Sequence, residues 1–139
     1  MLPGSPPRGS HPWGNAPTPY EELGGETVLR RLVDRFYDLV ESDSPVLRAM
    51  HPADDSNSRR NLFDFLSGWL GGPQLYMERK GHPRLRMRHA PFAIGTAEAE
   101  EWMRCMRGAL DEVEVVGPVR QYIERQLEQT ARHVRNAAP

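Results

Sequence analysis

One histidine, His89, stands at the end of a short basic segment and is the residue most suited to chemistry. It lies in the run Gly81-His-Pro-Arg-Leu-Arg-Met-Arg-His-Ala-Pro-Phe92. The proline two positions later disfavours helix for the residue before it, so a helix that reaches His89 should end there. The imidazole is then expected at a helix end, facing a pocket lined by Leu85, Met87 and Phe92. Such an apolar pocket with one neutral imidazole can hold a haem; a hydrogen-bonded loop histidine is the alternative interpretation.

Length, charge and cysteine content narrow the class of protein. The chain has 139 residues, which fits one domain with one core. The formal net charge of -1 gives no electrostatic reason to expect a nucleic-acid partner. Cys105 is the single cysteine, which excludes an internal disulfide and a cysteine-rich zinc site. Apolar runs are too short for a membrane span, and the N-terminus lacks the apolar region of a secretory signal, so we expect a cytoplasmic protein with no membrane partner.

The chain divides once, near Thr18. Residues 1–17 contain five prolines and three glycines. A segment of this composition cannot bury enough apolar surface to offset the entropy lost on ordering. We therefore predict a disordered extension over residues 1–17, from which Trp13 can touch the domain without a special role, and a folded domain over residues 18–139.

The folded part is predicted to be all-α. Four segments repeat apolar residues with helical spacing, and no stretch alternates with the period of a strand. A short lead-in helix and a turn at Gly24-Gly25 precede the first. The apolar stripes of the four segments are, in order, Leu29, Leu32, Val33, Phe36, Tyr37 and Val40; Leu62, Phe65, Leu66, Trp69 and Leu70; Trp102, Met106, Ala109, Leu110 and Val113; and Val119, Tyr122, Ile123, Gln126, Leu127, Thr130 and Val134. A turn-rich linker, Asp43 to Asn57, joins the first two, and a mostly irregular connection holds His89.

Several short motifs occur in an order that resembles a known family, the group II truncated haemoglobins. They are Gly24-Gly25, Phe36-Tyr37, Trp69-Leu70-Gly71-Gly72-Pro73, the run Gly81–Phe92 and Trp102. Each motif alone is weak, but together, in this order and at this spacing, they are strong, and the resemblance covers roughly residues 18–135. The resemblance implies a truncated globin fold, a two-over-two helical sandwich around haem.

The resemblance also implies a set of residues around haem b. His89 would bind the iron while its other ring nitrogen donates to a backbone carbonyl. Arg86 or Arg88, with Tyr76, would pair with the haem propionates; a solvated basic loop is the alternative for each arginine. The apolar wall would come from Leu62, Phe65 and Leu66 together with Leu85, Met87 and Phe92.

On the opposite face, the resemblance places Tyr37, His51 and Trp102 beside the ligand. Bound dioxygen carries partial negative charge, which a phenol O–H and an indole N–H can stabilise. The alternative makes Tyr37 and Trp102 ordinary core aromatics. His51 would bond the ligand directly, or through Tyr37 or water; otherwise it is a surface turn histidine before a proline. The gate position falls at Ser58, which is too small to form a bulky gate.

The function implied is reversible binding of dioxygen, NO or CO, in transport or sensing. Oxidation of NO or turnover of peroxide is also implied, and would need an external reductase, because the chain has no nicotinamide or flavin fingerprint. The sequence leaves open whether the protein is an enzyme and whether it is a monomer or a homodimer. A competing interpretation is a cofactor-free helical interaction module with a proline-rich partner-binding arm.

Overall fold

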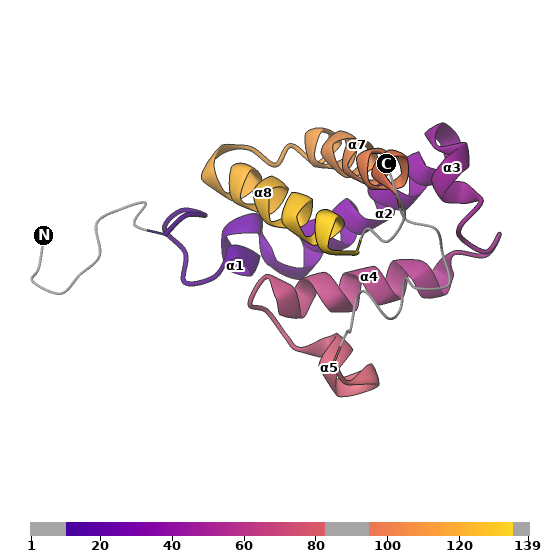
Figure 1. Ribbon diagram of the computed structural model, residues 1–139. Coiled ribbons are helices and arrows are strands. Elements are labelled where there is room, and N and C mark those ends of the chain that lie inside the picture. Colours follow the sequence, from indigo (N-terminus) through magenta and orange to yellow (C-terminus); the bar gives the residue numbers. More distant parts are fainter. Residues whose placement is uncertain (1–10, 83–94, 135–139) are drawn as a thin grey trace, which may run out of the picture.

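The computed structural model describes residues 11–82 and 95–134, which are helical and contain no named strand. The helices, in chain order, are α1 (Pro19–Leu23), α2 (Gly25–Asp43), α3 (Pro45–Arg48), α4 (Ser56–Trp69), α5 (Leu75–Lys80), α7 (Thr96–Glu112) and α8 (Gly117–Val134). Figure 1 shows α7 and α8 side by side over α2, with α4 beneath α2 and α5 beyond α4. This arrangement confirms the all-α, two-over-two architecture. None of the helices described is long and apolar enough to span a bilayer.

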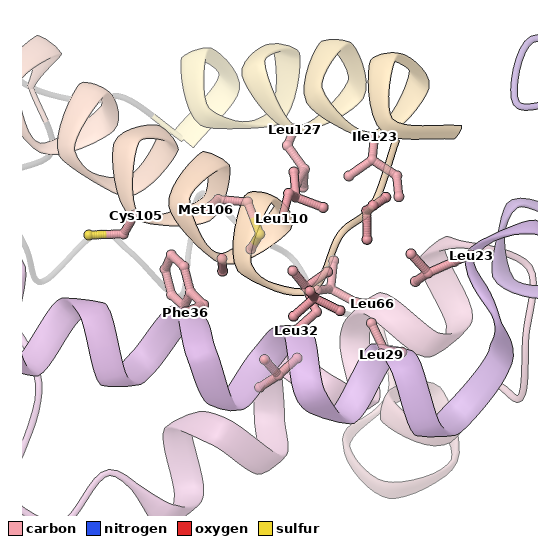
Figure 2. Packing of buried hydrophobic residues seen from close by; sticks show 14 of the residues in the cluster. Leu23, Leu29, Leu32, Phe36, Leu66, Cys105, Met106, Leu110, Ile123 and Leu127 are labelled. Atoms are coloured by element: carbon pink, nitrogen blue, oxygen red, sulfur yellow. The ribbon is translucent and has the colours of Figure 1, made fainter. Parts of the chain in front are cut away.

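The central helix is α2, which packs against both α4 and α7. All of the side chains predicted for its apolar stripe are buried: Leu29, Leu32, Val33, Phe36, Tyr37 and Val40. Their spacing places them on one broad helical face, which is wide enough to pack against two neighbouring helices at once. Figure 2 shows that this face belongs to one buried cluster with side chains from α4, α7 and α8, among them Leu66, Met106, Leu110, Ile123 and Leu127.

The stripes predicted for α7 and α8 are confirmed at their central positions. Buried residues there are Met106, Ala109, Leu110, Val113, Val119, Ile123 and Leu127. Trp102 and Tyr122 are only half-buried, which leaves part of each ring accessible to other groups. Cys105 is also buried, as expected of a cysteine that acts as a small hydrophobe.

The apolar residues of α4 divide between two environments, which differs from the single stripe predicted. Phe63, Leu66 and Leu70 are buried in the core. Leu62, Phe65 and Trp69 pack against the core but remain half-buried. We call these three half-buried residues the α4 stripe. Positions 62, 65 and 69 follow helical spacing, so α4 presents a second apolar face beside its buried one.

Two short helices, α3 and α5, lack a signal in the apolar pattern. They are four and six residues long, too short for helical periodicity to be recognised. Ser44 caps α3 by accepting from the Leu47 N–H (3.4 Å), and proline at the first helical position adds to this local signal. Tertiary contacts hold α5, because Arg79 donates to Asp64 of α4 (3.0 Å).

Residues 11–17, which belong to the predicted extension, contact the folded domain. Trp13 packs edge-on against Tyr122 of α8, with 5.3 Å between ring centroids, and its indole N–H donates to a carbonyl three residues later (2.8 Å). Glu22 of α1 accepts from two backbone N–H groups of this segment (2.8 and 2.9 Å). One large aromatic ring thus supplies apolar burial that average composition does not reveal. Residues 1–10 lie outside the described part of the chain.

A polar network joins the end of α2 to α7. Ser44 is fully buried and donates from Oγ to Glu101 Oε1 (2.9 Å). Arg104 donates to both oxygens of the same carboxylate (2.7 and 3.0 Å) and to the Asp43 carbonyl (2.8 Å). These bonds, first from Arg104 and then from Ser44, favour the ionised carboxylate and lower the pKa of Glu101 to about 2.

We predict that Glu101→Gln destabilises the fold at neutral pH and that its difference from the parent shrinks in acid. The folded chain holds the pKa of Glu101 below its ordinary value of 4.5. The ionised Glu101 carboxylate therefore stabilises the fold fully above pH 4.5, and this contribution is lost as the pH falls toward about 2. Urea unfolding at stepped pH measures the difference. Glu100→Gln, at the exposed preceding position, is the control and should follow the parent. A Glu101→Gln difference that stays constant down to about pH 2.5 would contradict this account.

Candidate functional site

Four rings, Phe36, Tyr37, His51 and Trp102, form a continuous group that we call the aromatic cluster. Phe36 and Tyr37 are consecutive on α2, Trp102 lies on α7, and His51 lies between α3 and α4. Phe36 contacts Tyr37 at 5.0 Å between ring centroids and Trp102 at 4.9 Å. Tyr37 meets His51 edge to face at 5.6 Å. The structure thus brings together the three polar rings predicted to share a site, through a phenylalanine that the prediction did not include.

The Tyr37 hydroxyl belongs to a side chain that is almost completely buried. Burial disfavours the phenolate, and the Asp55 carboxylate disfavours it further, so the pKa of Tyr37 is raised well above 10. The Arg59 cation opposes this rise but does not cancel it. Tyr37 therefore keeps its proton at physiological pH and remains a hydrogen-bond donor. Within residues 11–82 and 95–134, it donates to no side chain or carbonyl.

One hydrogen bond decides the tautomer of His51. Its Nδ1 lies 2.8 Å from the Leu47 carbonyl oxygen, which can only accept, so Nδ1 carries the proton. In the neutral ring Nε2 then presents a lone pair, and only the protonated ring can donate from that atom. Neutral His51 can therefore accept a hydrogen bond at Nε2 but cannot donate one there.

Trp102 contributes a second neutral donor to the aromatic cluster. Its ring is half-buried and lies tilted against Phe36, with 51° between the ring planes. Its indole N–H donates to no group in the described part of the chain. The preceding residue, Glu101, is held by Arg104 and by buried Ser44, which fixes this part of α7 relative to α3.

The α4 stripe offers an apolar surface with an aromatic partner on α5. Phe65 stacks on Trp69 with 6.3 Å between ring centroids. Tyr76 of α5 is buried and meets Phe65 edge to face, also at 6.3 Å. Arg79 holds α5 against α4 through Asp64. Large side chains that stay half-buried at helical spacing can pack against a flat apolar cofactor.

The remaining predicted site residues have different positions. Leu66, predicted as part of the haem wall, is buried in the core at 2% exposure, whereas Leu62 and Phe65 remain half-buried. Ser58 is half-buried in the first turn of α4, next to Arg59. The other predicted cofactor residues lie outside the described part of the chain: Leu85, Arg86, Met87, Arg88, His89 and Phe92.

Arg59 is a site-adjacent residue that the sequence-based prediction missed. Its guanidinium carbon lies 5.7 Å from the centre of the Tyr37 ring, and its nitrogens contact Asp55 (2.8 Å) and Asp38 (2.9 Å). The one local signal is the spacing from Asp55 to Arg59, because opposite charges four residues apart meet on a helix surface. Apolar periodicity cannot show that such a pair lies beside an aromatic ring on another helix.

The described residues fit haem on two counts. The aromatic cluster holds two neutral donors, Tyr37 and Trp102, that are uncommitted within the part of the chain described. The α4 stripe adds large apolar side chains that are only half-buried. A flat, largely apolar group with a polar ligand at its centre needs both kinds of surface.

The chain has clear relatives among known proteins. The sequence profile of the bacterial-like globin family matches residues 18–136. The Group 2 truncated hemoglobin YjbI of Bacillus subtilis is 45% identical over 118 residues, which cover 85% of this chain and 88% of the relative.

Solved structures agree with these sequence matches. The crystal structure of the group II truncated hemoglobin from Bacillus anthracis aligns with a TM-score of 0.87 and 41% identity, over 89% of this chain and all of the other. The truncated oxygen-avid haemoglobin from Bacillus subtilis aligns with a TM-score of 0.82 and 44% identity, over 86% of this chain and 99% of the other. The chain therefore belongs to the group II truncated haemoglobins, haem-binding two-on-two globins of the bacterial-like globin family.

Proposed function

We propose that the protein binds dioxygen and other diatomic ligands reversibly at haem held by His89, with Tyr37 and Trp102 donating hydrogen bonds to the ligand. One observation carries the proposal most strongly. Phe36 contacts both donor rings, which come from α2 and α7, and neither donates elsewhere in the described residues. Haem supplies an iron atom at which a small ligand can bind. The cofactor-free interaction module is not favoured, because the chain belongs to a haem-binding family.

Both proposed donors are neutral, and this suits the charge of the ligand. A dioxygen ligand bound in this site would carry partial negative charge, which the Tyr37 O–H and Trp102 N–H groups would stabilise without a full counter-charge. The raised pKa of Tyr37 supports this role, because the phenol keeps the proton that it donates. Carbon monoxide carries less charge on its outer atom, so the same donors should discriminate between the two ligands.

His51 has a different role in this proposal. The bond from Nδ1–H to the Leu47 carbonyl leaves Nε2 as an acceptor in the neutral ring. His51 then acts through a water molecule, which can donate one proton to Nε2 and the other to the ligand, whereas the single proton of the Tyr37 phenol cannot go to both. Of the interpretations left open by the sequence, this tautomer favours the one in which His51 acts through water.

The proposed cofactor is haem b, held without a covalent link. Covalent attachment of haem uses a cysteine pair followed by histidine, and the only cysteine here, Cys105, is buried on α7. Arg86, Arg88 and Tyr76 remain the proposed partners of the propionates. Buried Tyr76 is consistent with a place at the edge of the α4 stripe, since its ring contacts Phe65.

We predict that His89→Ala abolishes tight haem retention or removes the spectral signs of imidazole ligation. The reason is that no other histidine is proposed to hold the iron. Absorbance of the purified protein in the Soret region and the ferrous spectrum measure the effect. His82→Ala, in the same segment and directly before Pro83, is the matched control and should keep its haem. Full haem content and an unchanged ferrous spectrum in His89→Ala would refute the assignment.

We predict that Trp102→Phe releases dioxygen about ten- to hundredfold faster than the parent, because one donor worth roughly 1.5–3 kcal/mol is lost while most of the packing remains. Release of carbon monoxide should change much less. Adding Tyr37→Phe should give a non-additive effect, since both donors share one ligand. Stopped-flow release kinetics measure all three variants.

Trp13→Phe is the control for this experiment. It also removes an indole N–H bond, but one to the Ala16 carbonyl in the N-terminal segment. Its dioxygen release should match that of the parent. A rate for Trp102→Phe within about twofold of the parent would make Trp102 a packing residue only, and would leave Tyr37 as the proposed donor.

A further inference from the structure

The guanidinium of Arg59 connects two parts of the chain that carry the aromatic cluster. From α4 it donates to Asp55 Oδ1 (2.8 Å), to Asp38 Oδ1 (2.9 Å) and to Asp34 Oδ1 (3.2 Å). Glu41 Oε1 lies 3.7 Å away. The Arg59 side chain is only 23% exposed. One partly buried cation therefore faces four carboxylates, and we call this group the Arg59 clamp.

The acidic residues of the Arg59 clamp bracket Tyr37 along α2. Asp34 lies three residues before it, Asp38 directly after it and Glu41 four residues after it. The guanidinium carbon lies over the Tyr37 ring, 5.7 Å from its centre. A cation over an aromatic face is attracted to the ring, so Arg59 limits tilting of the phenol as well as movement of the helix.

The fourth carboxylate ties the clamp to the segment that carries His51. Asp55 lies four residues after His51, at the N-terminal end of α4. Its Oδ2 is buried. The bond from Arg59 to Oδ1 in the first place, and the adjacent Glu41 carboxyl after it, favour the ionised carboxylate and lower the pKa of Asp55. Removing Arg59 would leave this partly buried charge without its main partner, and the segment would have to shift to rehydrate it.

We propose that Arg59 is a positioning residue for ligand retention, which holds Tyr37 and the His51 segment so that the phenol O–H stays directed at the bound ligand. This rests on the proposed function, in which Tyr37 is a donor. Arg59 itself need not touch the ligand. Its effect should therefore pass through Tyr37, whereas an ion pair with a general structural role would act on stability alone.

The test is a double-mutant cycle between Arg59→Gln and Tyr37→Phe in the haem-loaded full chain. Arg59→Gln should speed dioxygen release about three- to tenfold, the size of coupling expected between contacting residues, and carbon monoxide release by less than about twofold. In the Tyr37→Phe background it should change dioxygen release by less than about twofold. Arg59→Lys keeps the charge but loses the planar fork, so it should give a smaller dioxygen-selective acceleration; it also serves if Arg59→Gln does not fold.

Arg35→Gln is the matched control. Arg35 lies on α2, contacts Asp38 as Arg59 does (2.9 Å), and joins α2 to α7 through Glu112 (2.8 Å). The structure gives it no contact with the Tyr37 ring. Loss of Arg35 should lower stability without selective acceleration of dioxygen release.

A structural readout accompanies the kinetics. In the diamagnetic carbon monoxide form, nuclear Overhauser effects between the Tyr37 and His51 rings report their contact. These effects should weaken in Arg59→Gln and stay unchanged in Arg35→Gln. Unchanged effects in Arg59→Gln would overturn the proposed positioning.

The outcomes separate two kinds of failure. If Tyr37→Phe does not speed dioxygen release, the proposed donor role of Tyr37 fails, and the inference about Arg59 falls with it. If Tyr37→Phe speeds release and Arg59→Gln does not, only the inference fails. The inference is equally overturned if Arg59→Gln accelerates both ligands alike, or keeps its full effect without the Tyr37 hydroxyl.

Discussion

The burial of Phe36 at the centre of α2 is the packing interaction on which the rest of the structure depends. Its side chain is 0% exposed and contacts the rings of Tyr37 and Trp102. Successive residues of a helix are turned by about 100°, so fixing Phe36 in the core also fixes the direction in which Tyr37 leaves the helix. A rotation of α2 that carried Tyr37 away from His51 would expose the buried stripe at a cost of roughly 1.5–3 kcal/mol for each large side chain.

Hydrogen bonds and ion pairs further restrict the positions of the helices that apolar packing has already oriented. Glu101 links buried Ser44 to Arg104, and Arg59 links α2 to the start of α4. The segment that carries His51 lies between these two networks and is held at both ends. Ser44 is fully buried and the Arg59 side chain is only 23% exposed, so these networks contribute to stability and also set positions in the aromatic cluster. Packing and positioning are thus assigned to different residues.

Much of this arrangement could be predicted from the sequence, and the remainder follows from contacts that periodicity does not encode. The apolar stripe of α2 was predictable because a helix that packs against two neighbouring helices has a broad, strongly periodic apolar face. In contrast, α5 depends on Arg79 reaching α4, and the order of residues 11–17 depends on Trp13 meeting Tyr122. The split of α4 into a buried and a half-buried face was not foreseen, because both faces have the same residue types.

A crystal structure of the haem-loaded protein with dioxygen bound would test the central claim most directly. The account predicts that the Tyr37 hydroxyl and the Trp102 indole nitrogen both lie within about 3.2 Å of the same dioxygen molecule, with His89 on the opposite face of the haem. The claim would be contradicted if either donor lay beyond hydrogen-bond distance of the ligand, or if a residue other than His89 held the iron.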